Sequence, residues 1–344
     1  SFSLPPYNFV FLNFLSLPTL LYILINYTHK KIISFFVGWV FGFGYFISNL
    51  YWITNSLTFD VNFKLIIPFA LILIPLFLGI FYGLVTFLSS LFNLKNKLSS
   101  VLIFSIFFGG IEFLRSFILG GFPWNLLVFS VSNNLPSLQI LSYVGTYSLN
   151  LLSITIFLLP IIFFHKYKSS AAVIFFCFGL ILVVINYSYG YFNIKNFEKK
   201  KYDKLDSVIR VVSPKVPIER FLTNQSPEKN IDELLTLSDP NKSEKKIFIF
   251  PEGIITSIYF RDLKFFKNIF KKKFNANHKV ILGINSIKEN KIYNSLVVLN
   301  SDTELLYKYN KNKLVPFGEF LPFENFFKRV GLKKITQGYQ SFSA

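Results

Sequence analysis

Two residue types that could build a covalent or metal-bound framework are scarce in this chain. It has one cysteine, Cys177, and three histidines that stand far apart, at positions 29, 165 and 278. A single cysteine cannot form an internal disulfide, and isolated histidines do not form the clusters that structural zinc sites need. We therefore expect no disulfide scaffold, no metal site and no cofactor. The chemistry must come from carboxylates, lysines and hydroxyls, or from outside this chain.

Charged residues make up only 16% of the 344 residues, whereas hydrophobic residues make up 52% and the mean hydropathy is +0.47. The apolar residues gather in long runs before residue 194, and a helix needs about 20 of them to cross the hydrocarbon core of a bilayer. Six runs reach that length: residues 9–27, 33–53, 65–92, 99–119, 137–164 and 171–192. The sequence thus predicts a membrane region, residues 1–194, with six transmembrane helices.

The net charge of +18 raises the question of a nucleic-acid partner. Residues 1–193 carry 8 basic and 2 acidic groups, and the remainder carries 28 and 16, so both halves are basic. The lysines of the second half stand beside Asn, Ile, Phe and Tyr, the amino acids of AT-rich codons. Genome composition therefore explains much of the excess, and the alternative is a surface that favours anionic phospholipid headgroups. We expect no nucleic-acid partner.

The connections between the apolar runs alternate in charge. Pairs of lysines stand in the first, third and fifth connections, at positions 30 and 31, 95 and 97, and 166 and 168, while residues 120–136 contain no lysine or arginine. Because basic connections remain in the cytoplasm, the sixth helix delivers the chain to the opposite face. The sequence therefore predicts that the region after about residue 193 lies outside the cytoplasm.

From residue 206 onward, short β-rich runs alternate with charged helical stretches, which is typical of a soluble α/β domain. Strands are predicted at residues 208–212, 247–250, 280–284, 295–300 and 305–309. Helices are predicted at residues 227–237, with Ser226 as N-cap and Pro227 at the first position, and at residues 261–274. We assign residues 195–344 to this domain.

One apolar run contains two charges. Glu112 and Arg115 lie three residues apart, so on a helix they share a face and can pair. Either the span ends near Arg115 and leaves its charge at the membrane interface, or the pair is functional beneath the loop that follows. That loop, residues 120–125, reads Gly-Gly-Phe-Pro-Trp-Asn, and Trp124 is typical of an interfacial anchor.

Two segments of the second half carry the candidate chemistry. The strand predicted at residues 247–250 is followed by Pro251, Glu252 and Gly253, so Glu252 lies at the carboxyl end of a strand, where open α/β folds place catalytic groups. A glutamate in such a turn is more often only part of the turn. The second segment, residues 309–322, reads Tyr-Asn-Lys-Asn-Lys-Leu-Val-Pro-Phe-Gly-Glu-Phe-Leu-Pro and contains Lys311 and Glu319.

This second segment resembles the signature of the nitrilase superfamily, and its Leu-Val-Pro-Phe-Gly-Glu core is similar to that of the apolipoprotein N-acyltransferases. The resemblance extends along the chain through Phe-Ser-Leu-Pro-Pro-Tyr at residues 2–7, the stretch from Gly38 to Trp52, Glu-Phe-Leu-Arg at 112–115, Gly-Phe-Pro-Trp at 121–124, Phe-Pro-Glu at 250–252 and Tyr-Asn-Ser at 293–295. It implies a multi-pass α-helical region in the inner membrane of a bacterium. A nitrilase-like α-β-β-α sandwich would follow on the periplasmic side.

The resemblance implies a Glu-Lys-Cys triad. Glu252 would take the proton of the thiol, Lys311 would stabilise the oxyanion, and a cysteine would attack the acyl ester of a phospholipid. The N-terminal amine of a diacylglyceryl-cysteine lipoprotein would then accept the acyl chain. Glu319 matches a further family carboxylate that holds the active site together, and Asn294 matches a supporting asparagine.

Some family features are not found in this sequence. The family cysteine lies in a Cys-Tyr-Glu segment downstream of the lysine, so we expect it beyond Ala344, together with a further span at each end of the chain. We therefore expect the nitrilase-like domain to be incomplete here. Cys177 is expected to pack among apolar side chains in the sixth span. Phe221 stands where the family has a tryptophan, and we count it and Trp124 as candidate substrate-binding residues.

The resemblance implies two partners, a phospholipid acyl donor and a diacylated prolipoprotein acceptor, and a monomeric enzyme. One alternative is a membrane-tethered nitrilase-type amidase that uses the same triad with water as acceptor. Another is a non-enzymatic transport or lipid-binding membrane protein, which predicts charges that line a path through the membrane. Only Glu112 and Arg115 are candidates for such a path.

Overall fold

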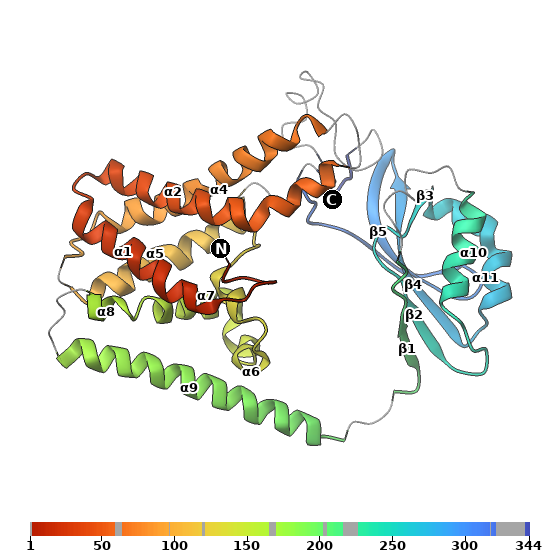
Figure 1. Cartoon of the computed structure of the whole chain (residues 1–344). Helices are drawn as coiled ribbons and strands as arrows, with labels where there is room; N and C mark the ends of the chain where they lie inside the picture. Colours follow the sequence, from red (N-terminus) through yellow and green to blue (C-terminus); the bar gives the residue numbers. More distant parts are fainter. Residues whose placement is uncertain are drawn as a thin grey trace. The chain divides into compact units, whose positions relative to one another are not determined.

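The computed structural model describes residues 2–58, 64–95, 97–118, 121–164, 170–201, 205–215, 226–316, 318–320 and 341–344. The chain divides into two compact units, Ser1–Lys201 (unit 1) and Tyr202–Ala344 (unit 2), and each is treated by itself (Figure 1). The sequence placed this boundary after residue 194. The last helix of unit 1 instead continues to Lys199, because nothing in its lysine-rich end stops a helix.

Unit 1 is helical, with short 3-10 turns between the helices. The main helices are α1 (Asn13–Tyr27), α2 (Lys31–Leu50), α4 (Ile67–Ser89), α5 (Ser99–Arg115), α7 (Leu141–Phe157) and α9 (Ser170–Lys199). The short elements are η1 (Val10–Leu12), η2 (Tyr51–Leu57), η4 (Leu127–Val131), α6 (Leu135–Leu138) and α8 (Ile161–Phe164).

Five stretches are helical, long and apolar enough to cross a membrane: Val10–Tyr27, Lys31–Leu57, Ile67–Ser89, Leu141–Phe163 and Ser170–Lys199. They correspond to five of the six predicted spans. The remaining prediction, residues 99–119, coincides with α5, which has 17 residues. At 1.5 Å per residue, such a helix is about 25 Å long, shorter than a typical hydrocarbon core. A sixth crossing therefore stays a prediction.

Apolar side chains cover much of the outside of unit 1. Only Ala172, Gly179 and Gly190 of the 30-residue helix α9 are buried, although the helix is strongly apolar. A helix that is hydrophobic all round and not buried in protein is suited to contact with lipid. Cys177 was expected to pack among apolar side chains in this span, and the structure instead places it on the exposed surface of the helix.

Helices α2 and α4 approach each other closely because small residues face across their interface. A Cβ at Gly42 would lie 2.9 Å from the Cα of Gly79, and one at Gly38 would lie 2.4 Å from the carbonyl oxygen of Tyr82. Any larger residue would push the helices apart. The indole N–H of Trp39 also donates to the carbonyl of Leu76 at 2.8 Å. Gly38 and Gly42 thus serve the packing of these two helices.

Helices α2 and α5 run in the same direction through the helical bundle. Trp52, two residues after the end of α2, and Trp124, nine residues after the end of α5, stack with ring centroids 5.2 Å apart. The carboxyl ends of both helices therefore lie at one end of unit 1, and their first residues, near Lys31 and Lys97, point to the other end (Figure 1). This geometry agrees with the predicted alternation of basic and non-basic connections.

Unit 2 is built on a mixed six-stranded sheet. Its strands are β1 (Val208–Val211), β2 (Lys246–Ile249), β3 (Ile255–Tyr259), β4 (His278–Lys288), β5 (Lys291–Leu299) and β6 (Leu305–Asn310). The order is β1-β2-β4-β5-β6, with β3 paired to the far half of β4. Strand β1 pairs in parallel with β2, and both β2 and β3 pair in parallel with β4. Strands β4, β5 and β6 form an antiparallel meander.

Helices α10 (Pro227–Leu237) and α11 (Lys267–Lys273) pack on one face of this sheet (Figure 1). Leu234 and Phe270 meet Phe248, Val280 and Val297, which are all fully or almost fully buried. The period of two along β4 and β5 turns every second apolar residue toward these helices. The core of unit 2 therefore lies between the helices and this face of the sheet.

The predicted elements of unit 2 differ from the structure in several places. The strands predicted at residues 280–284 and 295–300 are longer in the structure, where they form the hairpin of β4 and β5. Strand β3 was not predicted, although its Ile-Thr-Ser-Ile-Tyr sequence is typical of a strand. The helix predicted at residues 261–274 begins as a 3-10 turn, η6 (Phe260–Phe266), and becomes α-helical only in α11. Asp262 stabilises the turn by accepting a hydrogen bond from the backbone N–H of Tyr259 at 3.3 Å.

The other face of the sheet is apolar and open in the described part of unit 2. Side chains on β1, β5 and β6 are between 41% and 70% exposed there, and they are Ile209, Val211, Leu296, Tyr307 and Tyr309. The described residues thus show one sheet with helices on one face, a membrane-type helical region and an α/β unit. The second sheet layer of the α-β-β-α sandwich stays a prediction.

Candidate active site

Glu252 lies where the sheet changes partners. Strand β2 ends at Ile249, the chain turns through Glu252 and Gly253, and β3 then pairs with the far half of β4. Gly253 has a φ of 62°, which glycine adopts without strain. On β4, a Cβ at Gly283 would lie 2.7 Å from the Cα of Glu252, so only glycine allows the turn to approach this closely. The turn thus places the carboxylate at the carboxyl end of β2, as predicted.

The meander supplies the next two residues. Asn294 lies on β5, and Lys311 directly follows β6, where its backbone N–H donates to the carbonyl of Asn294 at 2.8 Å. This hydrogen bond extends the antiparallel ladder by one residue beyond the pair of Ser295 and Asn310. The two side chains are therefore fixed beside each other by the register of the sheet.

The four predicted polar residues come together in one cluster. The ammonium of Lys311 lies 3.0 Å from Oε1 of Glu252 and 3.1 Å from Oε1 of Glu319. The amide nitrogen of Asn294 donates to the same two oxygens, at 2.6 Å and 2.8 Å. Asn294 and Lys311, which follow Glu252 by 42 and 59 positions in the sequence, thus share its carboxylate. The structure brings together every described member of the predicted catalytic set.

Glu319 is the structural carboxylate of the cluster. Its side chain is 10% exposed, compared with 29% for Lys311 and 61% for Glu252. Its second oxygen, Oε2, accepts from the backbone N–H of Val315 at 2.8 Å, and its carbonyl accepts from the N–H of Phe342 at 2.8 Å. Both carboxylate oxygens are therefore occupied by hydrogen bonds, and Glu319 holds Lys311 in place.

Glu252 and Lys311 each keep an unused hydrogen-bonding position. Among the described residues, no side chain or backbone group donates to Oε2 of Glu252, and the ammonium of Lys311 uses two of its three N–H donors. The more exposed carboxylate can accept a proton at Oε2. The third N–H of Lys311 can donate to a developing negative charge.

The charges of the cluster set its protonation state. The pKa of Glu252 lies below its usual range, chiefly because Lys311 donates a hydrogen bond to it; partial burial works in the opposite direction, and Asn294 adds to the lowering. Partial burial tends to lower the pKa of Lys311, but the hydrogen bonds to Glu252 and Glu319 outweigh this and raise it. Near neutral pH the cluster therefore contains a carboxylate base and an ammonium.

A row of small polar side chains lies behind the cluster and was not predicted. Ser286 on β4 and Ser295 on β5 share a hydrogen bond of 2.7 Å, and Ser295 donates to Oδ1 of Asn310 at 2.9 Å. Both serines are buried. They link three neighbouring strands next to Asn294 and Lys311, and their only sequence signal was a polar residue at a core-facing position of a strand.

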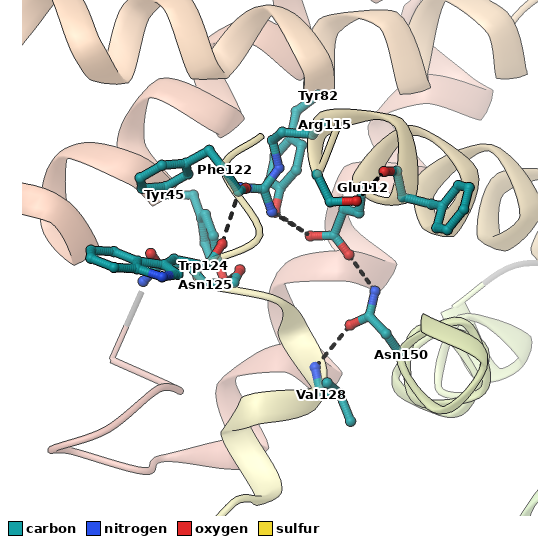
Figure 2. A network of polar contacts seen from close by, with 11 residues as sticks. Tyr45, Tyr82, Glu112, Arg115, Phe122, Trp124, Asn125, Val128 and Asn150 are labelled. Carbon is teal, nitrogen blue, oxygen red and sulfur yellow. Dashed lines mark hydrogen bonds and ion pairs between the residues drawn. The ribbon is translucent and has the colours of Figure 1, made fainter. Parts of the chain in front are cut away.

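A second polar network lies inside unit 1, around the two charges found in the sequence (Figure 2). Nη1 of Arg115 donates to the carbonyl oxygens of Phe122 and Trp124, at 2.8 Å and 3.0 Å. Nη2 of Arg115 lies 3.7 Å from Oε1 of Glu112. Both charged side chains are completely buried. Helix α5 does end at Arg115, but the guanidinium turns into the protein instead of the membrane interface.

Four further residues complete this network, and sequence reasoning missed them. The hydroxyl of Tyr82 donates to Oε1 of Glu112 at 2.9 Å, and the amide of Asn150 donates to Oε2. Oδ1 of Asn150 in turn accepts from the backbone N–H of Val128 at 2.9 Å (Figure 2). The signal for Asn150 was present, since an amide within an apolar span is costly unless it is paired. The hydroxyl of Tyr45 donates to the carbonyl of Asn125 at 2.8 Å.

The remaining predicted site residues are placed differently. Trp124 belongs to unit 1, where it is 49% exposed and stacks on Trp52, whereas the predicted catalytic set belongs to unit 2. Phe221 lies outside the described residues. Among the residues that the structure describes, no group of His, Cys, Asp or Glu side chains could hold a metal ion. In the cluster itself, the ammonium of Lys311 lies between the two carboxylates.

The chain is similar to known proteins along nearly its whole length. Residues 1–159 match the family described as the apolipoprotein N-acyltransferase N-terminal domain. Relatives named apolipoprotein N-acyltransferase include one from Rhizobium rhizogenes (strain K84 / ATCC BAA-868), 26% identical over 99% of this chain and 67% of the relative. Another, from Brucella melitensis biotype 1, is 25% identical over 99% of this chain and 66% of the relative.

A relative of the same name from Rickettsia prowazekii (strain Madrid E) is 28% identical over 88% of this chain and 60% of its own length. The chain thus spans about two thirds of the length of these relatives or somewhat less. The similarity runs through both units, because 99% of the chain is aligned in the first two cases. The resemblance predicted from the sequence is therefore confirmed, and the chain is similar to the apolipoprotein N-acyltransferases along nearly its whole length.

Proposed function

We propose that this chain carries out lipoprotein N-acylation in a bacterial membrane. It would transfer an acyl chain from a phospholipid to the N-terminal amine of a diacylglyceryl-cysteine lipoprotein. The observation that carries the proposal is the cluster of Glu252, Lys311, Glu319 and Asn294, which joins a carboxylate base and an ammonium with unused hydrogen-bonding positions. The names of the relatives and the five apolar helices support the same function.

In the first half of the proposed reaction, Glu252 takes the proton of a cysteine thiol at its unused oxygen. The resemblance implies a cysteine in a Cys-Tyr-Glu segment for this role. The thiolate attacks the ester carbonyl, and Lys311 donates to the resulting oxyanion. When the tetrahedral intermediate collapses, the ester C–O bond breaks and the leaving alkoxide takes the proton from Glu252. A thioester and a lysophospholipid result.

In the second half, the amine of the lipoprotein attacks the thioester and passes a proton to Glu252. Lys311 again stabilises the oxyanion, the C–S bond breaks, and the thiolate leaves and is reprotonated. Asn294 and Glu319 do not exchange protons in this scheme. They hold Glu252 and Lys311 at their observed positions, which keeps the base and the oxyanion donor aligned.

In this proposal unit 2 lies on the periplasmic side of the inner membrane, because the predicted cytoplasmic connections are the basic ones. An impermeant thiol reagent applied to intact cells tests this. A cysteine placed at exposed Lys242, in a Cys177→Ala background, should be labelled. Protection of this site would contradict both the orientation and a lipoprotein substrate.

The chemistry is tested in two steps with the protein as it is encoded. Phospholipid alone should give an acylated protein, detected by mass spectrometry, and addition of a diacylated lipopeptide should then give the triacylated product. Lys311→Ala should slow acylation by the ~3–4 kcal/mol typical of one preorganised oxyanion donor. Lys311→Arg should also be slow, since a guanidinium is larger and planar.

Lys267→Ala is the matched control, because Lys267 also pairs with a carboxylate, Asp302, at 2.9 Å but lies outside the cluster. It should acylate at the parental rate. Normal acylation by Lys311→Ala would remove the proposed role of this lysine. Full activity on a soluble amide, with none on the lipopeptide, would instead support the amidase alternative.

A further inference from the structure

An exposed aromatic pair lies at one end of unit 1. Trp52 and Trp124 stack with centroids 5.2 Å apart and an interplanar angle of 27°, yet they are 41% and 49% exposed. The ring of Phe122 lies 5.6 Å from that of Trp124. Residues 121–134, which surround Trp124, contain no charged side chain. This pair is a broad amphipathic surface without charge.

The loop that carries Trp124 is fixed from inside the protein. The side chain of Arg115 donates to two carbonyls of the loop, and the backbone carbonyl of Arg115 accepts from the N–H of Phe122 at 3.0 Å. The hydroxyl of Tyr45 donates to the carbonyl of Asn125 (Figure 2). Gly121 allows the sharp turn, because its φ is 85° and a Cβ there would lie 2.0 Å from the carbonyl oxygen of Ser116. Backbone contacts on both sides of the indole therefore set the position of Trp124.

Burial of the Arg115 guanidinium costs desolvation free energy, and the end of a helix can be stabilised without a buried charge. The Arg115 side chain is completely buried, its ion pair with Glu112 is 3.7 Å long, and its Nε and Nη2 atoms have no hydrogen-bond partner among the described residues. Apolar residues often replace buried ion pairs without loss of stability. What only a guanidinium supplies here is a rigid fork that holds two carbonyls and faces a carboxylate at once. The arrangement specifies a geometry.

The aromatic pair is continuous with the apolar outside of unit 1. Phe113 and Leu114, in the last turn of α5, are 45% and 49% exposed, and Tyr51, beside Trp52, is 56% exposed. Trp52 lies two residues after the end of α2, and the loop that carries Trp124 begins at the end of α5. An indole combines an apolar ring with a polar N–H, which favours the layer between hydrocarbon and water.

We propose that the Trp52–Trp124 pair is the surface with which this end of unit 1 contacts the headgroup and glycerol layer of a phospholipid bilayer, and that Arg115 is the positioning residue that holds it there. This inference does not rest on the proposed function. It gives the buried pair of Glu112 and Arg115 a role in placing a lipid-contacting surface. Neither charge then belongs to a path through the membrane.

The chain has three tryptophans, so a Trp39→Phe background leaves only the pair. The protein is reconstituted in nanodiscs whose phosphatidylcholine carries bromine either near the headgroup or near the end of the acyl chain. Bromine near the headgroup should quench the fluorescence more strongly, and the stacked indoles should give an exciton couplet in circular dichroism. Stronger quenching by deep bromine, or none by either lipid, would overturn the lipid-contact proposal.

The role of Arg115 is tested in the same background. Arg115→Gln should lose the couplet and the difference between the two brominated lipids. Arg115→Lys should retain only part of both, since its single nitrogen cannot occupy the positions of both Nη1, which holds the two carbonyls, and Nη2, which faces Glu112. The matched control is Asn13→Ala, which removes another buried hydrogen bond, 3.0 Å long to Ser130, without contacting the loop. It should keep the parental couplet.

If Arg115→Gln does not fold, Arg115→Lys alone decides the result. A parental couplet and parental quenching in the folded variant would overturn the positioning role, as would equal loss in Asn13→Ala. Trp124→Phe tests the surface without touching Arg115. It should abolish the couplet and leave Trp52 quenched mainly by shallow bromine, and mainly deep quenching of Trp52 would contradict the proposed surface.

Discussion

The two units each contain a pair of glutamate and a basic residue, but in opposite environments. In unit 1, Glu112 and Arg115 are completely buried and the ion pair is 3.7 Å long. In unit 2, Glu252 and Lys311 are 61% and 29% exposed and lie 3.0 Å apart. Substrate can reach only the second pair from solvent. Exposure therefore separates the pair that can do chemistry from the pair that can only organise structure.

The energetic consequences of the two pairs differ for the same reason. Charges in a low-dielectric interior interact strongly, but each has lost its water, so removal of one partner leaves an uncompensated charge. Charges near the surface are screened, and their pair contributes little to stability. We therefore expect substitutions in unit 1 to affect folding and substitutions in the cluster of unit 2 to affect mainly activity.

The largest effect on stability is expected for Glu112→Leu. This substitution leaves Arg115 buried and unpaired and should cost ~3–5 kcal/mol of folding free energy. The double variant with Arg115→Met should recover part of the loss, because the unpaired charge is gone. Thermal unfolding in detergent measures both. If the double variant were less stable than Glu112→Leu, the ion pair would not account for the cost.

Next in size is Asn294→Ala, which removes the amide that donates to both carboxylates of the cluster. Hydrogen bonds to charged groups contribute ~1.5–3 kcal/mol, so thioester formation should slow by that equivalent while the melting temperature changes little. The matched control is Asn300→Ala, since Asn300 also donates to a glutamate, Glu304, at 2.8 Å, but outside the cluster. Equal slowing in both variants would argue against a role specific to the site.

A smaller effect is expected from pH. The pKa of Glu252 is lowered in the folded protein, so the stability that its pairing contributes is present above the unfolded pKa and is lost as pH falls through the folded value. The loss should therefore occur below pH ~4 and stay below ~1 kcal/mol, because the group is exposed.

Acid unfolding of the parent and of Glu252→Gln checks this. The two proteins should differ in stability near neutral pH and converge as the pH falls below the folded pKa. The pKa of Lys311 is raised, so its contribution is present below its unfolded pKa and is lost only at strongly alkaline pH. A stability difference that persists in acid would show that the carboxylate charge is not its cause.

The smallest effect is expected for Cys177→Ala, because this side chain is exposed on α9 and contacts no polar network among the described residues. Stability should change by less than ~0.5 kcal/mol and acyl transfer should not change. A loss of acylation in this variant would make Cys177 a candidate nucleophile and contradict the cysteine position that the resemblance implies.

Local patterns were sufficient for most elements of both units. Apolar run length predicted five of the long helices to within a few residues, and Ser226 and Pro227 predicted the start of α10, where the hydroxyl of Ser226 accepts from the N–H of Lys229. These features depend on neighbours in the chain, so the sequence alone contains them. The extent of α9 and the 3-10 start before α11 were not predicted, because helix ends depend weakly on local residues.

The members of the polar cluster in unit 2 were predicted from motifs, and the geometry of the cluster was not. Resemblance named Glu252, Lys311, Glu319 and Asn294, but it did not say that one amide and one ammonium would each contact both carboxylates. That arrangement depends on the register of β5 and β6 and on the close approach of Gly283 to Glu252. Sheet register is a non-local property and cannot be read from either segment alone.

The sequence by itself determined that this chain combines apolar helices with an α/β unit and which family it resembles. It also singled out two sets of charged residues, Glu112 with Arg115 in the first unit and Glu252, Lys311 and Glu319 in the second. Only the tertiary structure decided what each charge does. Glu112 and Arg115 stood three residues apart in the sequence, with two roles open, and burial among Tyr82, Asn150 and the carbonyls before Asn125 makes them a structural pair. The physical reason is that exposure and hydrogen-bond partners, which set the cost and reach of a charge, come from residues distant in the chain.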